Sequence, residues 1–152
     1  DPKHEFADEV HSYFGSGTAL QEMYITPSLL NASDWDTLAE AANWSRANAD
    51  ILKDTHWIGG DPGQLEVYGW AAWSPRQGTL TLRNPSDQAQ AYALDIGIAL
   101  ELPADAAMIY AARSPGKNAK TPDMTLTAGQ AVMLHLQPFE VITLDLTPVS
   151  RP

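Results

Sequence analysis

Leucine and threonine alternate in the segment Gly78-Thr79-Leu80-Thr81-Leu82-Arg83-Asn84-Pro85-Ser86, which ends in a turn-forming Asn-Pro-Ser sequence. Because successive side chains of a strand point to opposite faces, this alternation predicts a β-strand with leucines on one face and threonines on the other. The segment Val141–Leu146 has the same pattern, with Ile142, Leu144 and Leu146 on its apolar face. Two half-buried strands of this kind indicate a layered β fold.

Further short apolar segments follow one another after residue 60, separated by Pro, Gly, Asn and Asp. Strands at this spacing, without interleaved helices, favour an antiparallel arrangement over a parallel sheet. Residues 61–152 are therefore predicted to form a mainly β domain, an antiparallel β-sandwich of about 7–8 strands in a Greek-key-like order. The segment Ile98–Leu102 fits either a strand or a short helical turn. Predicted strands lie near Leu65–Trp73, Thr79–Arg83, Gln90–Asp95, Ala107–Ala112, Met124–Thr127, Ala131–Leu136 and Val141–Leu146.

Residues 1–60 have a different pattern and are predicted to form a helical segment in front of the sandwich. Thr18 is expected to cap a short helical turn that runs to Tyr24. The turn-forming residues at 59–63 mark the boundary between the two parts. A first helix is indicated by apolar residues at helical spacing, Phe6, Val10, Tyr13 and Phe14.

The clearest predicted helix is Asp34–Lys53. Ser33 is its expected N-cap, and Asp34 and Asp36 in the first turn favour the positive end of the helix dipole. We expect its apolar face to be buried against the sandwich or left as a patch that drives self-association. That face is predicted to contain Trp35, Leu38, Ala42, Ser45, Ala49 and Leu52.

The sequence has no Lys/Arg cluster of the kind that nucleic-acid binding requires, and its net charge of −10 disfavours anionic membrane surfaces. No apolar run approaches the ~20 residues of a membrane span. The chain contains no cysteine, which removes disulfides and thiolate chemistry but does not fix the compartment. Because the chain begins at Asp1-Pro2 without Met, we expect it to be a piece of a longer protein.

We expect no catalytic residue, no metal site and no cofactor in this chain. The four histidines lack zinc-ligand spacing, and no nucleophile elbow or phosphate-binding glycine motif occurs. The polar cluster Asp54-Thr55-His56-Trp57 is interpreted as the exit loop of a helix. Glycoside hydrolysis needs two carboxyl groups in one cleft. Most acids of the sandwich instead fall in turns or near strand ends, namely Asp61, Asp87, Asp95 and Asp145.

Aromatic residues allow two interpretations. Tyr68, Trp70 and Trp73 cluster in one predicted strand, and exposed aromatic rings are platforms for sugar rings, so the three form a candidate carbohydrate-binding strip. Strand alternation, however, places Trp73 on the face opposite to Tyr68 and Trp70. The other interpretation is that they fill the core and contact the helical segment, because aromatic rings dominate core packing. The remaining tryptophans, Trp35, Trp44 and Trp57, are interpreted as helix-packing anchors.

The order of three motifs resembles that of a known family. The tryptophan-bearing segment Leu65–Trp73, the following Gly78–Ser86 and the later Leu136-Gln137-Pro138-Phe139-Glu140-Val141 are similar to the C-terminal β-sandwich of glycoside hydrolases with α-galactosidase-like (β/α)8 barrels. Upstream, Leu20–Leu30 and Asp34–Lys53 resemble the last helical portion of such a barrel, joined to the sandwich by residues 54–62.

This resemblance implies that the chain is a non-catalytic accessory domain and that its partner is the catalytic barrel of a parent enzyme. Catalytic carboxylates of that family lie on earlier barrel strands, so no catalytic residue can be assigned here. A secreted or periplasmic bacterial parent is compatible with the lack of cysteine. The alternative is a carbohydrate-binding module that uses Tyr68, Trp70 or Trp73. A third hypothesis, an independent small hydrolase, finds no supporting motif.

Overall fold

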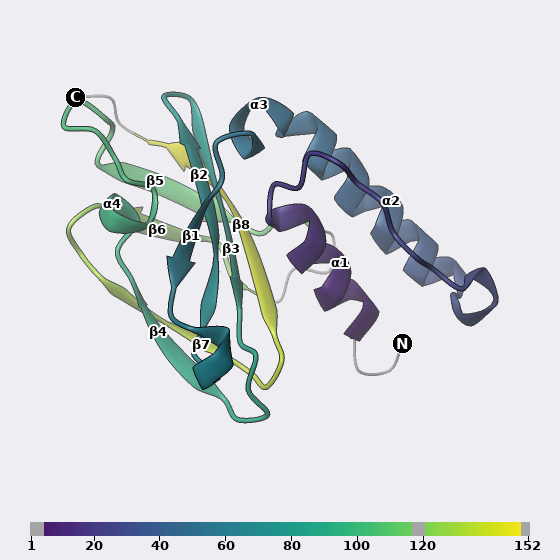
Figure 1. Cartoon of the computed structure of the whole chain (residues 1–152). Helices are drawn as coiled ribbons and strands as arrows, with labels where there is room; N and C mark the ends of the chain where they lie inside the picture. Colours follow the sequence, from purple (N-terminus) through teal and green to yellow (C-terminus); the bar gives the residue numbers. More distant parts are fainter. Residues whose placement is uncertain (1–4, 117–120, 150–152) are drawn as a thin grey trace.

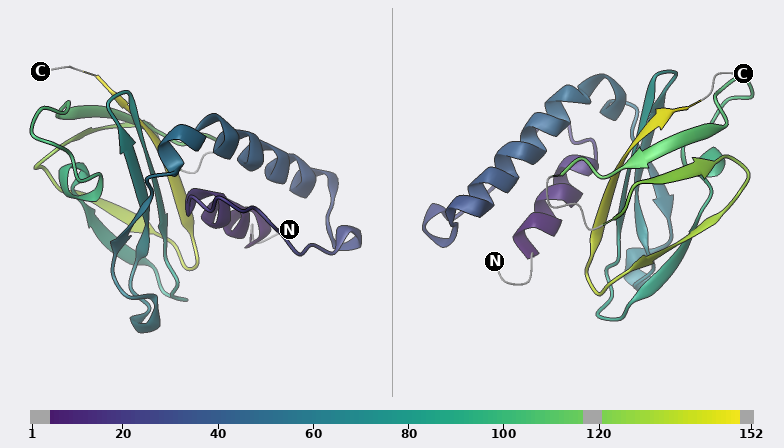
Figure 2. Two further views of the ribbon diagram at one scale, coloured as in Figure 1. Left: turned by 45° about the horizontal axis from the view of Figure 1, so that its top comes forward. Right: turned by 180° about the vertical axis from the view of Figure 1, so that it is seen from behind.

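The computed structural model describes residues 5–116 and 121–149, which form three layers (Figure 1). A helical layer covers one face of a six-stranded sheet, and a two-stranded sheet covers the other face. Two further views show the helices on the same side of the large sheet (Figure 2). The predicted order of a helical segment followed by a β-sandwich is confirmed.

Every pairing between neighbouring strands is antiparallel. The larger sheet has the order β1-β2-β3-β8-β5-β6, and the smaller one pairs β4 with β7. This confirms the predicted antiparallel sandwich. The strand bounds are β1 (His56–Gly59), β2 (Tyr68–Ser74), β3 (Gln77–Arg83), β4 (Gln90–Leu94), β5 (Ile109–Arg113), β6 (Met124–Thr127), β7 (Val132–Leu136) and β8 (Val141–Pro148).

The main hydrophobic core lies between the two sheets. Leu80 and Leu82 of β3 face Leu134 and Leu136 of β7 across it, and all four side chains are buried. A fully buried leucine contributes about 1.5–3 kcal/mol. The predicted alternation of β3 is therefore correct on its leucine face.

Three helices form the outer layer: α1 (Glu5–Gly15), α2 (Ala32–Ala47) and α3 (Ala49–Leu52). α1 packs on β3 and β8, α3 packs on β2 and β3, and a small core of Val10, Phe14 and Ala41 joins α1 to α2. None of the described helices is long and apolar enough to cross a membrane. Single turns occur at η1 (Pro27–Leu29), η2 (Pro62–Gln64) and α4 (Ile96–Ala99).

The helical layer buries the threonine face of the large sheet. Thr79, Thr81 and Thr143 are all buried, and the hydroxyl oxygens of Thr81 and Thr143 lie 3.4 Å apart. Gly15 at the end of α1 rests on Thr81, so close that a Cβ atom at position 15 would lie 2.7 Å from Thr81 Cβ. Both faces of β3 are thus inside the molecule.

The N-terminus of α2 differs from the prediction. Asn31, not Ser33, is the N-cap: its side chain accepts a hydrogen bond from the Asp34 amide, and the Asp34 carboxylate accepts one from the Asn31 amide. With Asn31 as the N-cap, Asp34 is the third residue of the helix, so this reciprocal capping box satisfies two backbone donors at once. The predicted single helix Asp34–Lys53 is also divided, because Asn48 separates α2 from α3.

Three other segments differ locally from the expectation. Residues 18–26 form no helix, with bends at 19–20, where a helical turn from Thr18 to Tyr24 was predicted. β1 lies within the expected exit loop and pairs with β2, so the sheet begins before residue 61. The ambiguous segment near Ile98–Leu102 begins as the helical turn α4, capped by the Asp95 side chain.

Candidate functional site

Three aromatic side chains form a cluster on the outer face of β1 and β2. Trp57 of β1 lies directly opposite Trp70 of β2, and Trp70 lies opposite Thr81 of β3. Directly opposite residues share one face of a sheet. Trp70 therefore lies on the face that carries the helical layer. We call Trp57, Tyr68 and Trp70 the aromatic cluster.

The rings of the aromatic cluster are in mutual contact. Trp57 stacks on Tyr68 with ring centroids 4.9 Å apart and an angle of 8° between the ring planes. Trp70 meets both rings edge-on, at 6.0 Å from Trp57 and 5.6 Å from Tyr68. Such pairs are worth about 0.5–1.5 kcal/mol beyond their area burial. Because Trp57 remains 50% exposed, the cluster is a preformed apolar surface.

Trp73 does not join the other two predicted site residues. It packs against the main core, and its indole Nε1 donates a hydrogen bond of 2.9 Å to the Tyr110 hydroxyl. Strand alternation predicts this separation. Trp57 lies in the cluster although it was predicted to be a helix-packing anchor, because β1 was not predicted as a strand. Of the three proposed anchors, Trp44 contacts the helical core, whereas Trp35 is 43% exposed.

An ion pair lies beside the aromatic cluster. Arg83, which pairs with Tyr68 across the sheet, donates hydrogen bonds to both carboxylate oxygens of Glu9 on α1. The hydrogen bond to Glu9 outweighs burial and raises the pKa of Arg83 above its usual value. A bidentate Arg–carboxylate pair restricts the relative orientation of the two side chains more than a single hydrogen bond does. It therefore fixes α1 next to the aromatic cluster.

An open groove of about 300 Å³ runs between β1 and the segment formed by β4 and α4. Two of its polar groups serve the backbone: His56 Nε2 is 2.8 Å from the Ala99 carbonyl oxygen, and Asp95 accepts hydrogen bonds from the amides of Gly97 and Gly129. Burial raises the pKa of Tyr92, which also lines the groove. These bonds favour a structural role for the His56 and Asp95 side chains.

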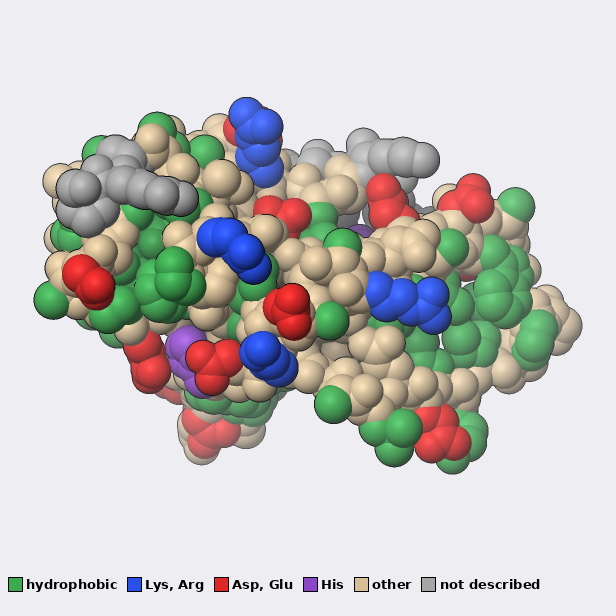
Figure 3. Space-filling model, turned by 90° about the horizontal axis from the view of Figure 1, so that it is seen from above, with side chains coloured by type: hydrophobic (Ala, Val, Ile, Leu, Met, Phe, Trp, Pro, Cys, Tyr) green, Lys and Arg blue, Asp and Glu red, His purple; other side chains and the backbone are tan. Residues whose placement is uncertain are grey.

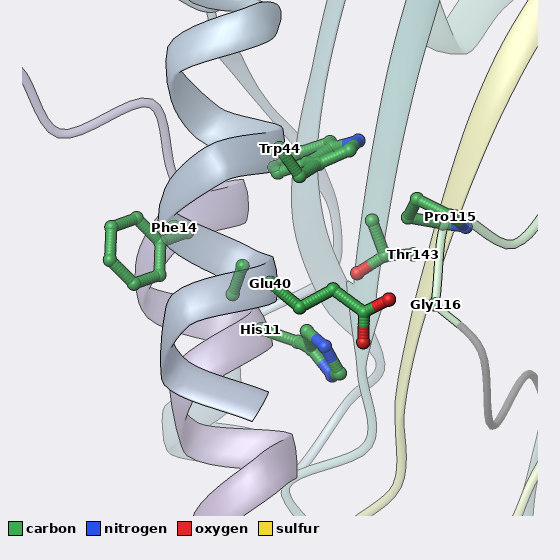
Figure 4. A pocket seen from close by; sticks show the side chains of 8 residues that line it. His11, Phe14, Glu40, Trp44, Pro115, Gly116 and Thr143 are labelled. Atoms are coloured by element: carbon green, nitrogen blue, oxygen red, sulfur yellow. The ribbon is translucent and has the colours of Figure 1, made fainter. Parts of the chain in front are cut away.

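A much smaller cavity of about 20 Å³, large enough for one water molecule, lies between the helices and the sheet. Figure 4 shows His11 of α1 and Glu40 of α2 directed toward this space, with Trp44 beside them. Trp44 Nε1 donates a hydrogen bond of 2.8 Å to Asp145 of β8. Burial raises the pKa of Asp145, and this hydrogen bond opposes the rise.

Other acids of the sandwich cap the backbone. Asp61 accepts a hydrogen bond from the Gly63 amide, Glu66 accepts one from the Asp61 amide, and Glu140 accepts one from the Gln137 amide. Within residues 5–116 and 121–149, no group of three or more His, Asp and Glu side chains is placed to hold a metal ion. These three carboxylates therefore stabilise the loops in which they lie by accepting hydrogen bonds from backbone amides.

Comparisons with known proteins identify the fold. No protein-family model matches the sequence, and no curated protein matches it. A Bacillus halodurans C-125 structure assigned as an alpha-N-acetylgalactosaminidase matches 96% of this chain with a TM-score of 0.69 and 14% sequence identity. Alpha-galactosidase I from Mortierella vinacea matches 97% of it with a TM-score of 0.64 and 10% identity.

A trehalose-6-phosphate hydrolase from Bacillus licheniformis matches 80% of the chain, with a TM-score of 0.51 and 13% identity. At these identities the matches establish a shared fold. The chain spans 32% of the length of the B. halodurans protein and 36% of the M. vinacea protein. Because almost all of the chain is matched in both, the likeness includes the helical layer as well as the sandwich.

Proposed function

We propose that this chain is the non-catalytic C-terminal accessory region of a glycoside hydrolase, in which the helical layer is the end of a catalytic barrel. The observation that carries the proposal is the match of helices and sandwich together to about a third of two longer chains, both named as glycosidases. A sandwich on its own would be a common fold with many functions. A match that includes the helices as well as the sandwich favours one of these functions, the C-terminal region of a glycosidase.

The arrangement of the helical layer supports this proposal. α1 and α2 run side by side in the same direction, and residues 18–31 return between them in a mostly extended conformation (Figure 1). Two parallel helices joined by an extended segment form the repeating unit of folds with a parallel sheet. Within the described part of the chain, no backbone–backbone hydrogen bond involves residues 19–25. A neighbouring strand of a parent barrel would supply such bonds.

Exposed apolar side chains lie on the same segment. Leu20, Tyr24 and Leu29 are 78%, 93% and 79% exposed, and hydrophobic side chains gather at the far end of the helical layer (Figure 3). Contiguous apolar patches of this kind mark contact surfaces. Under this proposal the rest of the barrel covers these side chains. The sandwich then shields that end of the barrel and fixes its orientation.

The test compares this chain with the full-length gene product that contains it. We expect the chain alone to give no turnover of aryl glycosides, including 4-nitrophenyl α-galactoside, and the full-length product to hydrolyse at least one of them. Turnover by the chain alone that disappears on substitution of a single carboxylate would show that the chain is itself an enzyme. An inactive full-length product would contradict the assignment to a glycoside hydrolase.

A second candidate function is carbohydrate binding. The observation that favours it is the preformed aromatic cluster, which adds Trp57 to the predicted residues Tyr68 and Trp70 and leaves out Trp73. Titration with oligosaccharides, followed by tryptophan fluorescence, separates the two functions. A saturable change at millimolar sugar that is lost in Trp57→Ala favours binding, whereas no change favours the accessory role.

A further inference from the structure

The two longer helices, α1 and α2, lie side by side on the outer face of the large sheet, and the short α3 packs on β2 and β3. α1 lies over β3 and β8, as Gly15 against Thr81 shows. α2 lies one step further along: its Trp44 bonds to Asp145 of β8, and α2 shares the small cavity with Pro115, which follows β5. In the sheet order β1-β2-β3-β8-β5-β6, α2 therefore lies nearer β5, and α1, which precedes it in the chain, lies nearer β1.

The spacing of α1 and α2 locates the next helix position on this face. Packed helices lie about 8–10 Å apart and neighbouring strands about 4.8 Å apart, so one helix covers roughly two strands. A helix on the side of α1 away from α2 would lie over β1 and the Tyr68–Trp70 end of β2, because α3 already packs near the β2–β3 hairpin end. That area holds the aromatic cluster, and the Arg83–Glu9 ion pair marks its border with α1.

The aromatic cluster is suited to such a cover. Trp57 and Tyr68 stack flat, and Trp70 stands edge-on beside them, so the three rings present a fixed apolar surface rather than mobile side chains. Trp57 is half exposed although its sheet neighbours on the same face, Thr79 and Thr81, are buried under helices. The cluster thus continues a face whose other parts already bind helices.

We propose that the aromatic cluster is the seat of the helix that precedes α1 in the full-length polypeptide. The inference rests on the proposed function, because it requires a longer chain with at least one more helix–strand unit before α1. The occupant is an amphipathic helix that turns its apolar face to Trp57, Tyr68 and Trp70. On this assignment the cluster joins the sandwich to the barrel and is not a sugar platform.

Hydroxyl-radical footprinting with mass spectrometry tests the proposal, since it reports the exposure of each tryptophan separately. The isolated chain is compared with the full-length gene product. We expect oxidation of Trp57 to fall severalfold in the full-length product. Met133 on β7, which is 54% exposed on the opposite side of the sandwich, is the internal control and should be oxidised equally in both.

Several outcomes would overturn the inference. Trp57 oxidised equally in both proteins, while the full-length product hydrolyses glycosides, would refute it and leave the proposed function intact. Protection of Trp57 in the isolated chain by an oligosaccharide, or by dimerisation seen in sedimentation, would give the surface a different occupant. Protection in a full-length product without glycosidase activity would support the seat and reject only the proposed function.

Discussion

Replacing Trp44 by phenylalanine removes the hydrogen bond that joins α2 to β8. The indole N–H donates to Asp145 at 2.8 Å, across 101 residues of sequence, and phenylalanine keeps an aromatic ring without that donor. The carboxylate then stays between the helical layer and the sheet with its indole partner gone. We expect Trp44→Phe to destabilise the folded chain as a whole, because the helices and the sandwich share this contact.

The magnitude follows from the type of bond. A hydrogen bond to a charged group contributes about 1.5–3 kcal/mol, and the partial exposure of Asp145 places the expected loss near the middle, at about 2 kcal/mol. For a chain of this length each kcal/mol lowers the melting temperature by about 2–4 °C, so the expected decrease is about 4–8 °C. Trp44→Phe also trims a little packing surface, which adds to the loss.

The stability lost in Trp44→Phe is expected to depend on pH in one direction. Burial raises the pKa of Asp145 above its ordinary 3.8, so between 3.8 and the folded-state pKa the folded chain binds more protons than the unfolded chain. Stability from this group therefore falls as pH rises through that window. Removing the Trp44 donor raises the pKa further. The difference between the wild type and Trp44→Phe should thus be smaller at pH 4 than at pH 7.

Urea unfolding followed by far-UV circular dichroism at pH 4 and pH 7 measures these differences. Trp35→Phe is the matched control, because Trp35 is an exposed tryptophan on the same helix and should change stability by less than about 0.5 kcal/mol. Asp145→Asn combined with Trp44→Phe should be less sensitive to pH than Trp44→Phe alone. An equal loss at both pH values would refute the role of the carboxylate.

Three other substitutions test contacts elsewhere in the fold, each by urea unfolding at pH 7. Asn84→Asp places a carboxylate against the backbone carbonyls that the buried amide now binds, and should cost about 3–5 kcal/mol. Tyr110→Phe removes the acceptor of the Trp73 indole N–H and should cost about 1 kcal/mol. Gly15→Ala forces a Cβ atom into Thr81 and should cost about 1–3 kcal/mol.

Matched controls for these three are available in the chain. Gly116→Ala adds a Cβ atom where, apart from its chain neighbours, no atom of the described residues lies within 4 Å, and should be neutral. Tyr24→Phe is the control for Tyr110→Phe, because Tyr24 is 93% exposed. Asp87→Asn is the control for Asn84→Asp, because it exchanges a carboxylate and an amide on an exposed turn residue. If a control and its test variant lose equal stability, the contact named for that test is not the cause.

The sandwich was predictable because its signals are local. The Leu–Thr alternation of β3 and the similar pattern of β8 fix which face each residue occupies, and the two strands pair as neighbours. The buried Asn84 explains the turn after β3: its amide joins the β3–β4 turn to the end of β7 through the carbonyls of Gln88 and Gln137. An asparagine at that point predicts a turn from sequence, but the sequence does not reveal its bond to Gln137, 53 residues away.

The errors arose where distant contacts decide the local structure. β1 has only four residues and one buried side chain, so its hydrophobic pattern is too short to predict a strand. Its pairing with β2 is what defines it as one. Residues 18–26 form no helix although Thr18 predicted a capped turn there, and this segment links the end of α1 to the start of α2. The place of the N-cap depended on Asp34, whose carboxylate reaches Asn31 and not Ser33.

The outer face of the large sheet links these observations. Its short β-branched residues Thr79, Thr81 and Thr143 lie under α1 and its neighbours, where small side chains let a helix approach closely. The same face changes to large aromatic residues at Trp57, Tyr68 and Trp70 of β1 and β2, beyond the part of β2 on which α3 packs, and Trp57 there is half exposed. A face that water alone covered would gain nothing from a rigid stack of three rings, because exposed aromatic area is unfavourable in water. The change from threonine to aromatic side chains along one face therefore argues that its uncovered part, like its covered part, is built to bind another segment of protein.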